Sequence, residues 1–371
     1  MCAMLAGVVV SAAACGSEVS TSPVTTPVIP ITPTPPVVTR YFPPLATDEW
    51  ETISPAAAGW DTTALRTALD WAGTQQSTAV LVLWRGRIAA ERYWKGWTPS
   101  KDSLIASAGK SITSVLIGIQ QAQGRLRIDA PASTLLGNGW SRSPASEARV
   151  TIRHLLSMTS GLDDSLKFVL EPGTRFYYNN PAYYQTFDLL TRSAGLTFSP
   201  TNINALSKSL LFDRIGMRSA NWRLNIDTGE PGFVLWCTPR DMARFGLLTL
   251  NAGIWNSTNV LGDTSYARSM ATSSNTSNPS YGYLWWLNGQ SQYRIPGPYV
   301  LPNVPGSIIP SAPRDLIAAL GKGDKKIYVV PSLELVLVRQ GPEADAAGSN
   351  PLAISSFDEQ LWARLKPAFR Y

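Results

Sequence analysis

Two pairs of apolar segments at opposite ends of the chain constrain its fold more than any other feature. Each pair is interrupted by a short turn and is rich in β-branched and large apolar residues, which predicts two β-hairpins. The segments are Ala79–Trp84, Ile88–Trp94, Ile327–Val330 and Leu335–Val338. The sequence between the pairs is mostly helical and rich in loops. We therefore expect an α/β (α+β) fold, in which an antiparallel sheet is built from both chain ends and flanked by helices. A mostly helical insertion would span about residues 111–300.

Helix signals flank the predicted hairpins. Asp61 precedes Thr62 and an apolar-periodic segment, which is typical of a capped helix extending to about Ala72. A second amphipathic helix is expected at about 354–365. With 371 residues, 44% of them hydrophobic and 16% charged, the chain has ample material for a core. We place one domain at residues 48–371.

The N-terminal residues have the composition of a targeting segment. Residues 3–14 are almost wholly apolar and too few to span a bilayer, which is typical of a signal peptide at residues 1–15. Ala14-Cys15-Gly16 resembles a bacterial lipoprotein processing site, where Cys15 would be lipidated. Residues 16–47 are rich in Pro and Thr and are expected to form an extended linker. We expect export to the cell envelope or periplasm on a membrane tether, with simple secretion as the alternative.

The charge pattern and the rare residue types exclude several classes of protein. The net charge of +6 is scattered without a basic stripe, so nucleic-acid binding is not expected. One histidine and three cysteines are too few for a His/Cys zinc site, and no cofactor is predicted. The single histidine, His154, lies in an amphipathic segment and is interpreted as structural. Gly109-Lys110-Ser111 resembles the end of a phosphate-binding loop, but Leu104 stands where that loop needs glycine.

Ser107 and Lys110 form the main chemical motif. They open a strongly apolar segment, and residues three apart on a helix share a face, so the hydroxyl and the amine could touch. A neutral lysine could then take the serine proton. The Ser-x-x-Lys pattern is common by chance. The alternative is a polar helix start with a solvated lysine.

A second motif lies about seventy residues further along the chain. Pro172-Gly173 marks a turn, and Tyr178-Asn179-Asn180-Pro181 ends any regular element. A tyrosine and an asparagine two residues apart on a loop could face one pocket. A lysine ammonium beside Tyr178 would lower the pKa of the phenol enough for it to relay protons. The alternative is an aromatic loop that packs on the core.

With these motifs in order, the chain resembles the penicillin-recognising serine hydrolases. It is most similar to the class C β-lactamase-like branch, which includes esterases, D-aminopeptidases and 6-aminohexanoate-dimer hydrolase. The resemblance covers roughly residues 48 to 368, and its fold would be β-lactamase-like. The matching stretches are 107–111, 151–162, 172–180, 238–246 and 281–286.

The resemblance implies a role for each matching residue. Ser107 would be the nucleophile and Lys110 its general base, while Tyr178 would relay the proton to the leaving group. Asn180 would orient Lys110 or the substrate. The backbone N–H near Lys322, after Gly321, would form an oxyanion hole with that of Ser107. Trp286 belongs to an aromatic stretch expected near the substrate.

The third motif departs from the family pattern. The position that usually carries a Lys, His or Trp is Ala319, in Ala319-Leu320-Gly321. That side chain commonly engages a substrate carboxylate in β-lactam recognition, so strong β-lactamase activity is not expected.

The sequence thus predicts an exported serine hydrolase that acts on a small ester, amide or peptide. An alternative is a cell-wall D-amino-acid peptidase or a β-lactamase. A third is a catalytically silent homologue that binds peptidoglycan or a protein. The sequence leaves the substrate and the oligomeric state open.

Overall fold

The computed structural model describes residues 39–225, 232–297, 302–345 and 354–371. The predicted signal peptide, Cys15 and most of the predicted linker lie outside the described residues. None of the described helices is both long and apolar enough to span a bilayer.

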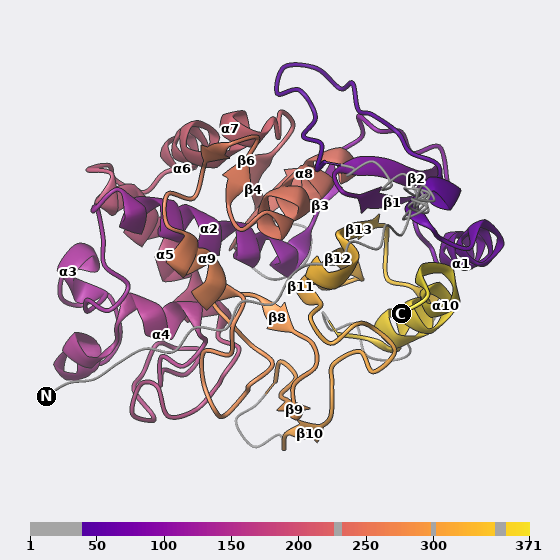
Figure 1. Ribbon diagram of the computed structural model, residues 1–371. Coiled ribbons are helices and arrows are strands. Elements are labelled where there is room, and N and C mark those ends of the chain that lie inside the picture. Colours follow the sequence, from indigo (N-terminus) through magenta and orange to yellow (C-terminus); the bar gives the residue numbers. More distant parts are fainter. Residues whose placement is uncertain (1–38, 226–231, 298–301, 346–353) are drawn as a thin grey trace, which may run out of the picture. The chain divides into compact units, whose positions relative to one another are not determined.

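A six-stranded antiparallel sheet is built from both ends of the described chain, as predicted (Figure 1). In the centre of the sheet, β1 pairs with β13, so that Ala79 lies opposite Gln340 and Trp84 opposite Leu335. The strands in spatial order are β2 (Arg87–Tyr93), β1 (Ala79–Trp84), β13 (Leu335–Gln340), β12 (Lys325–Val330), β11 (Ile317–Gly321) and β8 (Trp286–Leu287). The first and last hairpins are therefore neighbours in space.

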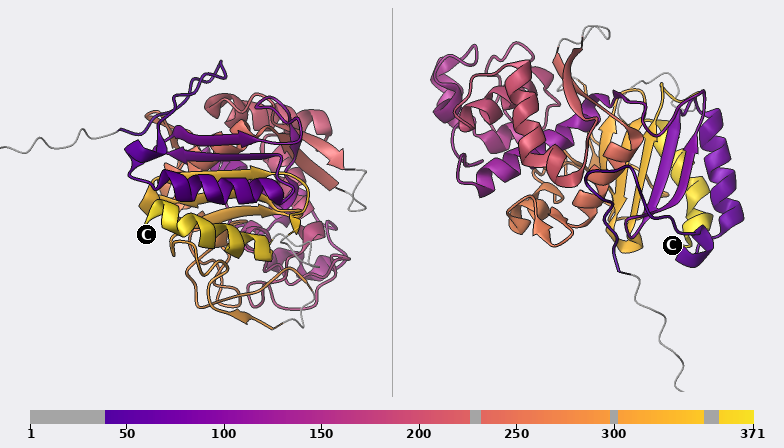
Figure 2. Two further views of the ribbon diagram at one scale, coloured as in Figure 1. Left: turned by 90° about the vertical axis from the view of Figure 1, so that its right-hand side faces the viewer. Right: turned by 90° about the horizontal axis from the view of Figure 1, so that it is seen from above.

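Helices cover both faces of this sheet. The terminal helices α1 (Thr62–Thr74) and α10 (Ser356–Phe369) pack side by side on one face (Figure 2). Helix α8 (Pro239–Leu250) packs against the other face, where a Cβ on Gly246 would lie 2.4 Å from Val336. Because successive side chains of a strand point to opposite faces, neighbouring residues of β12 and of β13 pack against different layers of the domain.

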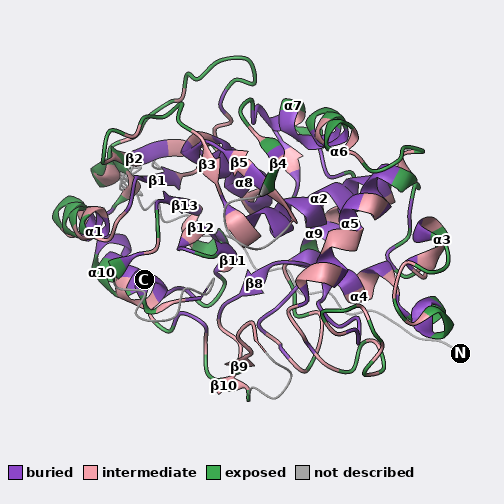
Figure 3. Ribbon diagram, turned by 180° about the vertical axis from the view of Figure 1, so that it is seen from behind, coloured by how far each residue is buried: buried purple, intermediate pink, exposed green. Residues whose placement is uncertain are grey.

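The segment between the two hairpins is mostly helical and surrounds the buried helix α2 (Gly109–Ala122), which Figure 3 shows in purple. The other helices of this segment are α3 (Ser133–Leu136), α4 (Ile152–Leu156), α5 (Asn180–Ser193), α6 (Pro200–Ser207), α7 (Asp213–Ile215) and α9 (Thr264–Met270). The segment also contains short sheets that the sequence did not predict. Their strands are β3 (Ser103–Leu104), β4 (Asn221–Asn225), β5 (Gly232–Cys237), β6 (Ile254–Trp255), β7 (Thr258–Asn259), β9 (Gln292–Tyr293) and β10 (Val304–Pro305).

Residues 39–47, which the composition assigned to the linker, pack on the domain. The Arg40 guanidinium forms an ion pair with Glu334 at 2.6 Å, and the Phe42 ring meets the Trp255 ring edge-on at 5.2 Å. Arg244 donates hydrogen bonds to the carbonyls of Pro44 and Thr47. The packed domain therefore begins before the predicted boundary at residue 48, because tertiary contacts hold a segment with a linker-like composition.

Candidate active site

Ser107 lies in a tight turn between a strand and a buried helix. The strand β3 pairs with β5, and the amide of Ile105 donates to the carbonyl of Leu235, which anchors the chain just before the turn. Ala106 adopts φ +46°, the left-handed region that L-residues seldom occupy. The single 3₁₀ turn Ala106–Ala108 then leads directly into α2. Ser107 is therefore presented at the N-terminal end of a helix by a strained turn, an arrangement that is frequent at catalytic residues.

Lys110 contacts the serine as the spacing predicted. Its Nζ atom lies 3.1 Å from Ser107 Oγ, and the lysine is only 5% exposed. The ring centres of Tyr183 and Tyr178 lie 4.4 and 5.1 Å from the same nitrogen. These aromatic faces stabilise an ammonium group, so the surroundings suit a lysine that gains a proton during a reaction.

The sequence motifs gave no role to Tyr183. Its hydroxyl is 2.9 Å from the Thr113 hydroxyl on α2, and burial raises the pKa of the phenol far above its usual range. The Tyr183 hydroxyl is therefore engaged with α2, and its ring face is what meets Lys110. Tyr183 lies three residues after Asn180, in the first turn of α5. This spacing is the sequence signal that could have predicted its place beside Lys110.

The Tyr178-Asn179-Asn180 segment is held by the start of α5. Asn179 caps this helix, since its Oδ1 accepts from the amide of Ala182 at 2.8 Å. The Asn179 Nδ2 donates to the carbonyl of Leu162. Asn179 thereby holds Tyr178 on one side and Asn180 on the other. The ring of Tyr178 reaches Lys110 and also packs against Trp286.

Trp286 lies behind the site. It is 3% exposed, and its ring stacks on that of Tyr178 with centroids 6.1 Å apart and planes at 12°. The structure thus places Trp286 against the tyrosine, not on the cavity wall where the sequence motif suggested it. The reason is that β8, the edge strand carrying Trp286, turns this side chain toward the aromatic cluster with Tyr281.

Gly321 closes the site from the sheet. A Cβ at this position would lie 2.3 Å from the carbonyl oxygen of Ile105 and 3.2 Å from the amide nitrogen of Ala108. The end of β11 therefore approaches the serine turn more closely than any residue with a side chain allows. Lys322 follows directly and lines the same cavity as Ser107.

A cavity of about 330 Å³ opens over these residues. Four predicted residues line it, namely Ser107, Lys110, Asn180 and Lys322. Two charged residues that the motifs did not identify, Lys325 and Glu343, also line it. The remaining lining residues are Leu104, Ala106, Tyr183, Tyr184, Trp222, Phe233, Val234, Gly323 and Pro342.

Asn180 lines this cavity, but its amide oxygen is enclosed by the protein. Its Oδ1 atom is buried and receives no hydrogen bond from the described residues. An amide oxygen in that situation is costly to bury without a donor. The role suggested for Asn180, orienting Lys110 or the substrate, stays a prediction.

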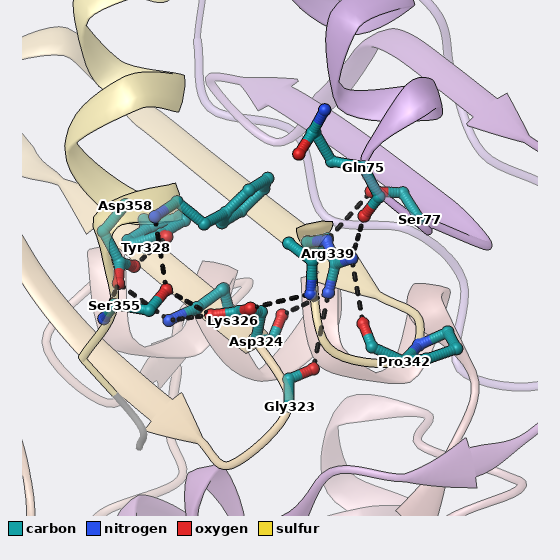
Figure 4. Close-up of polar contacts among 12 residues, drawn as sticks. Gln75, Ser77, Gly323, Asp324, Lys326, Tyr328, Arg339, Pro342, Ser355 and Asp358 are labelled. Carbon is teal, nitrogen blue, oxygen red and sulfur yellow. Dashed lines mark hydrogen bonds and ion pairs between the residues drawn. The ribbon is translucent and has the colours of Figure 1, made fainter. Parts of the chain in front are cut away.

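A buried network of charged groups holds the β11–β12 turn (Figure 4). The Arg339 guanidinium donates to the carbonyls of Asp324 at 2.8 Å and Pro342 at 3.0 Å, and so joins the turn to the segment after β13. Lys326 forms ion pairs with Asp324 at 3.1 Å and Asp358 at 2.9 Å, and all three are at most 1% exposed. Burial alone would raise the pKa of Asp324, but the Lys326 ammonium and hydrogen bonds from Ser355 and Ala344 hold this pKa below its usual value.

Removing the central cation of this network is expected to destabilise the protein strongly. Lys326→Met would leave two carboxylates buried without their partner, which costs about 3–5 kcal/mol. Urea unfolding followed by tryptophan fluorescence measures this loss. Lys208→Met is the matched control, because the ion pair of Lys208 with Asp213 is exposed and worth about 0–1 kcal/mol. Equal stability of the two variants would contradict the proposed importance of the network.

The single histidine is structural, as interpreted from the sequence. The amide of Thr151 donates to His154 Nδ1, and the Thr151 hydroxyl accepts from the amide of His154, which together cap α4. Burial lowers the pKa of the imidazole. Within the described part of the chain, no group of three or more His, Cys, Asp or Glu side chains could hold a metal ion.

Comparison with known proteins identifies the family. The beta-lactamase family model matches residues 64–338, which is most of the chain and spans all the motifs described above. The protein therefore belongs to the beta-lactamase family of serine hydrolases. No curated protein sequence matches the chain significantly.

Solved structures share the fold at low sequence identity. The structure of a Bacteroides dorei protein assigned as a beta-lactamase matches with a TM-score of 0.67 and 18% identity. The match covers 84% of this chain and 100% of that one. A protein from Bacillus anthracis assigned as a 6-aminohexanoate-dimer hydrolase matches with a TM-score of 0.58 and 20% identity, covering 75% and 76%. The beta-lactamase/D-alanine carboxypeptidase of Yersinia pestis matches with a TM-score of 0.58 and 16% identity. The match covers 82% of this chain and 98% of that one. These similarities confirm the predicted β-lactamase-like fold.

Proposed function

We propose that the protein is an exported serine hydrolase that cleaves a small ester or amide through an acyl-enzyme on Ser107. The observation that supports this most directly is the 3.1 Å contact between Ser107 Oγ and Lys110 Nζ beside the cavity. Family membership and the fold agree with hydrolysis, and the chemistry needs no metal or cofactor.

In the proposed reaction, neutral Lys110 takes the Ser107 proton while Oγ attacks the substrate carbonyl. The resulting Lys110 ammonium is stabilised by the faces of Tyr183 and Tyr178. The backbone amides of Ser107 and Lys322 bind the carbonyl oxygen as it gains negative charge. Tyr178 passes the proton to the leaving group, and water then hydrolyses the acyl-enzyme with the same groups acting in reverse.

Labelling by a fluorophosphonate tests the nucleophile. The wild-type protein should be labelled and should hydrolyse a short-chain p-nitrophenyl ester, because a fluorophosphonate traps activated serines. Ser107→Ala should lose both, with residual turnover lower by at least about a thousandfold. Ser103→Ala is the matched control, because Ser103 lies on the preceding strand and is absent from the cavity. Labelling that persists in Ser107→Ala would rule out the assignment.

A β-lactamase or cell-wall peptidase activity is less well supported. Ala319 is 1% exposed and is not among the residues that line the cavity, so the usual recognition side chain is missing from the third motif. Turnover of nitrocefin or trapping of labelled penicillin would separate these activities from ester and amide hydrolysis.

A further inference from the structure

The cavity has two chemically different walls. One is apolar and aromatic and comes from α5, β3 and the β4–β5 hairpin. Its residues are Leu104, Tyr183, Tyr184, Trp222, Phe233 and Val234. The other wall is charged and comes from the β11–β12 turn and the residues after β13, with Lys322, Lys325 and Glu343. Ser107 and Lys110 also line this cavity. A substrate whose carbonyl lies at Ser107 could therefore contact both walls.

The register of the sheet directs Lys325 to the active-site face. Lys325 lies directly opposite Gly321, the residue that touches the serine turn. Cross-strand partners project from the same face, and glycine offers no side chain that would cover its neighbour. The next residue, Lys326, points to the opposite face, where it pairs with Asp358 of α10. Lys325 therefore faces the active site, while Lys326 faces α10.

The Lys325 ammonium lies over the turn. A Cβ on Gly323 would be 2.6 Å from Lys325 Nζ and 3.5 Å from the amide nitrogen of Glu343. Arg339, which binds the carbonyls of Asp324 and Pro342, holds the two segments that carry Lys325 and Glu343. Arg339 is fully buried, and Figure 4 shows its contacts with these two segments.

Given the proposed function, we infer that Lys325, assisted by Lys322, binds an anionic group of the substrate. The preferred substrate is then an ester or amide with an apolar portion on one side and a carboxylate on the other. Apart from Lys110, which acts in its neutral form, the lining contains two lysines and a single glutamate, so an anion is favoured over a cation. The negative charge of Glu343 weakens the attraction between these lysines and a bound anion.

The surroundings of Lys325 make this preference depend on pH. Burial, and then the positive charge of Arg339, lower the pKa of Lys325 to about 8, while Asp324 and Glu343 oppose the shift and Lys326 adds to it. The ammonium form is present below this pKa and is lost as the pH rises through about 8. Preference for an anionic substrate should decline over the same interval.

Matched ester pairs test the inference. On the acyl side, the mono-p-nitrophenyl ester of adipic acid is compared with p-nitrophenyl hexanoate. On the leaving-group side, 4-hexanoyloxybenzoate is compared with 4-hexanoyloxybenzamide. In at least one pair, Lys325→Gln should lower the ratio of kcat/KM for the anionic to the neutral ester by about tenfold, mainly through KM. Glu343→Gln should raise the same ratio. Lys366→Gln, an exposed lysine on α10 outside the cavity, should leave it unchanged.

Two readouts separate this inference from the proposed hydrolase function. Turnover of the neutral esters by the wild-type protein reports on the hydrolase function alone. Isothermal titration of the Ser107→Ala protein with monomethyl adipate measures anion binding without turnover, and the additional Lys325→Gln change should weaken this binding about tenfold. Ratios unchanged by Lys325→Gln in both ester pairs, with unchanged binding in the titration, would overturn the inference.

Discussion

Replacing Lys110 by methionine is expected to lower kcat/KM for a neutral p-nitrophenyl ester by about 10²–10⁴-fold. Lys110 Nζ is 3.1 Å from the serine oxygen, and a positioned general base contributes a factor of this size. Methionine has a similar length and suits the aromatic surroundings of Tyr183 and Tyr178. Initial rates at saturating and limiting ester measure the loss, which should fall mainly on kcat.

Lys110→Arg separates charge from proton transfer. A guanidinium keeps the positive charge but does not give up its proton at neutral pH, so this variant should be as slow as the methionine variant. Thermal unfolding of both proteins shows whether the site still folds. If folded Lys110→Met retained more than about a third of the wild-type rate, another group would have to be the base.

Gly321→Ala is expected to lower kcat for the same ester by about 10²–10³-fold. The new Cβ would lie 2.3 Å from the Ile105 carbonyl oxygen, so the strand end and the serine turn must separate. That separation moves the Lys322 amide away from the carbonyl oxygen of the substrate, and the loss of one oxyanion donor costs a factor of this size. Steady-state kinetics should show a smaller change in KM than in kcat.

Gly109→Ala is the matched control for this substitution. Gly109 is two residues from Ser107, but a Cβ there would meet its nearest atoms at 3.4 Å, an ordinary contact distance. Alanine at this helical position should leave turnover within about threefold of wild type and should not weaken the helix. If the two alanine variants were equally active, the close approach of β11 to the serine turn would have no catalytic role.

The local motifs of the site were predictable because they depend on short spacings. The three-residue interval places Lys110 on the same helix face as Ser107, and the structure brings their side chains into contact. The two hairpins were equally visible, since two short apolar strands and the turn between them are encoded within about fifteen residues. The pairing of the first hairpin with the last, through β1 and β13, agrees with the predicted sheet built from both chain ends.

Lys325 and Arg339 could not be predicted in the same way. Lys325 reaches the cavity only because the register places it opposite Gly321, while its neighbour Lys326 points to α10. A shift of one residue would exchange the two lysines, and no local pattern distinguishes them. Arg339 is fully buried in a strand that is otherwise apolar apart from Gln340, and its partners come from three separate segments.

Composition alone misplaced two other features. Residues 39–47 resemble a linker, yet carbonyls from this segment are acceptors for Arg244, whose partners lie far away in the sequence. Trp286 carries the aromatic character expected of a substrate wall, but its place on the edge strand turns it toward Tyr178. In both cases tertiary packing outweighs the local character of the segment.

The pairing of β1 with β13 also makes the completion of the proposed site a late step in folding. Ser107 and Lys110 leave the ribosome early, but Gly321, the Lys322 amide and Arg339 follow only near the end of the chain. Until those last strands join the sheet, the proposed nucleophile Ser107 lacks the second of its two proposed oxyanion donors, the Lys322 amide. A shortened product that ends before β11 would lack the Lys322 amide, and we expect it to be inactive on the esters named above.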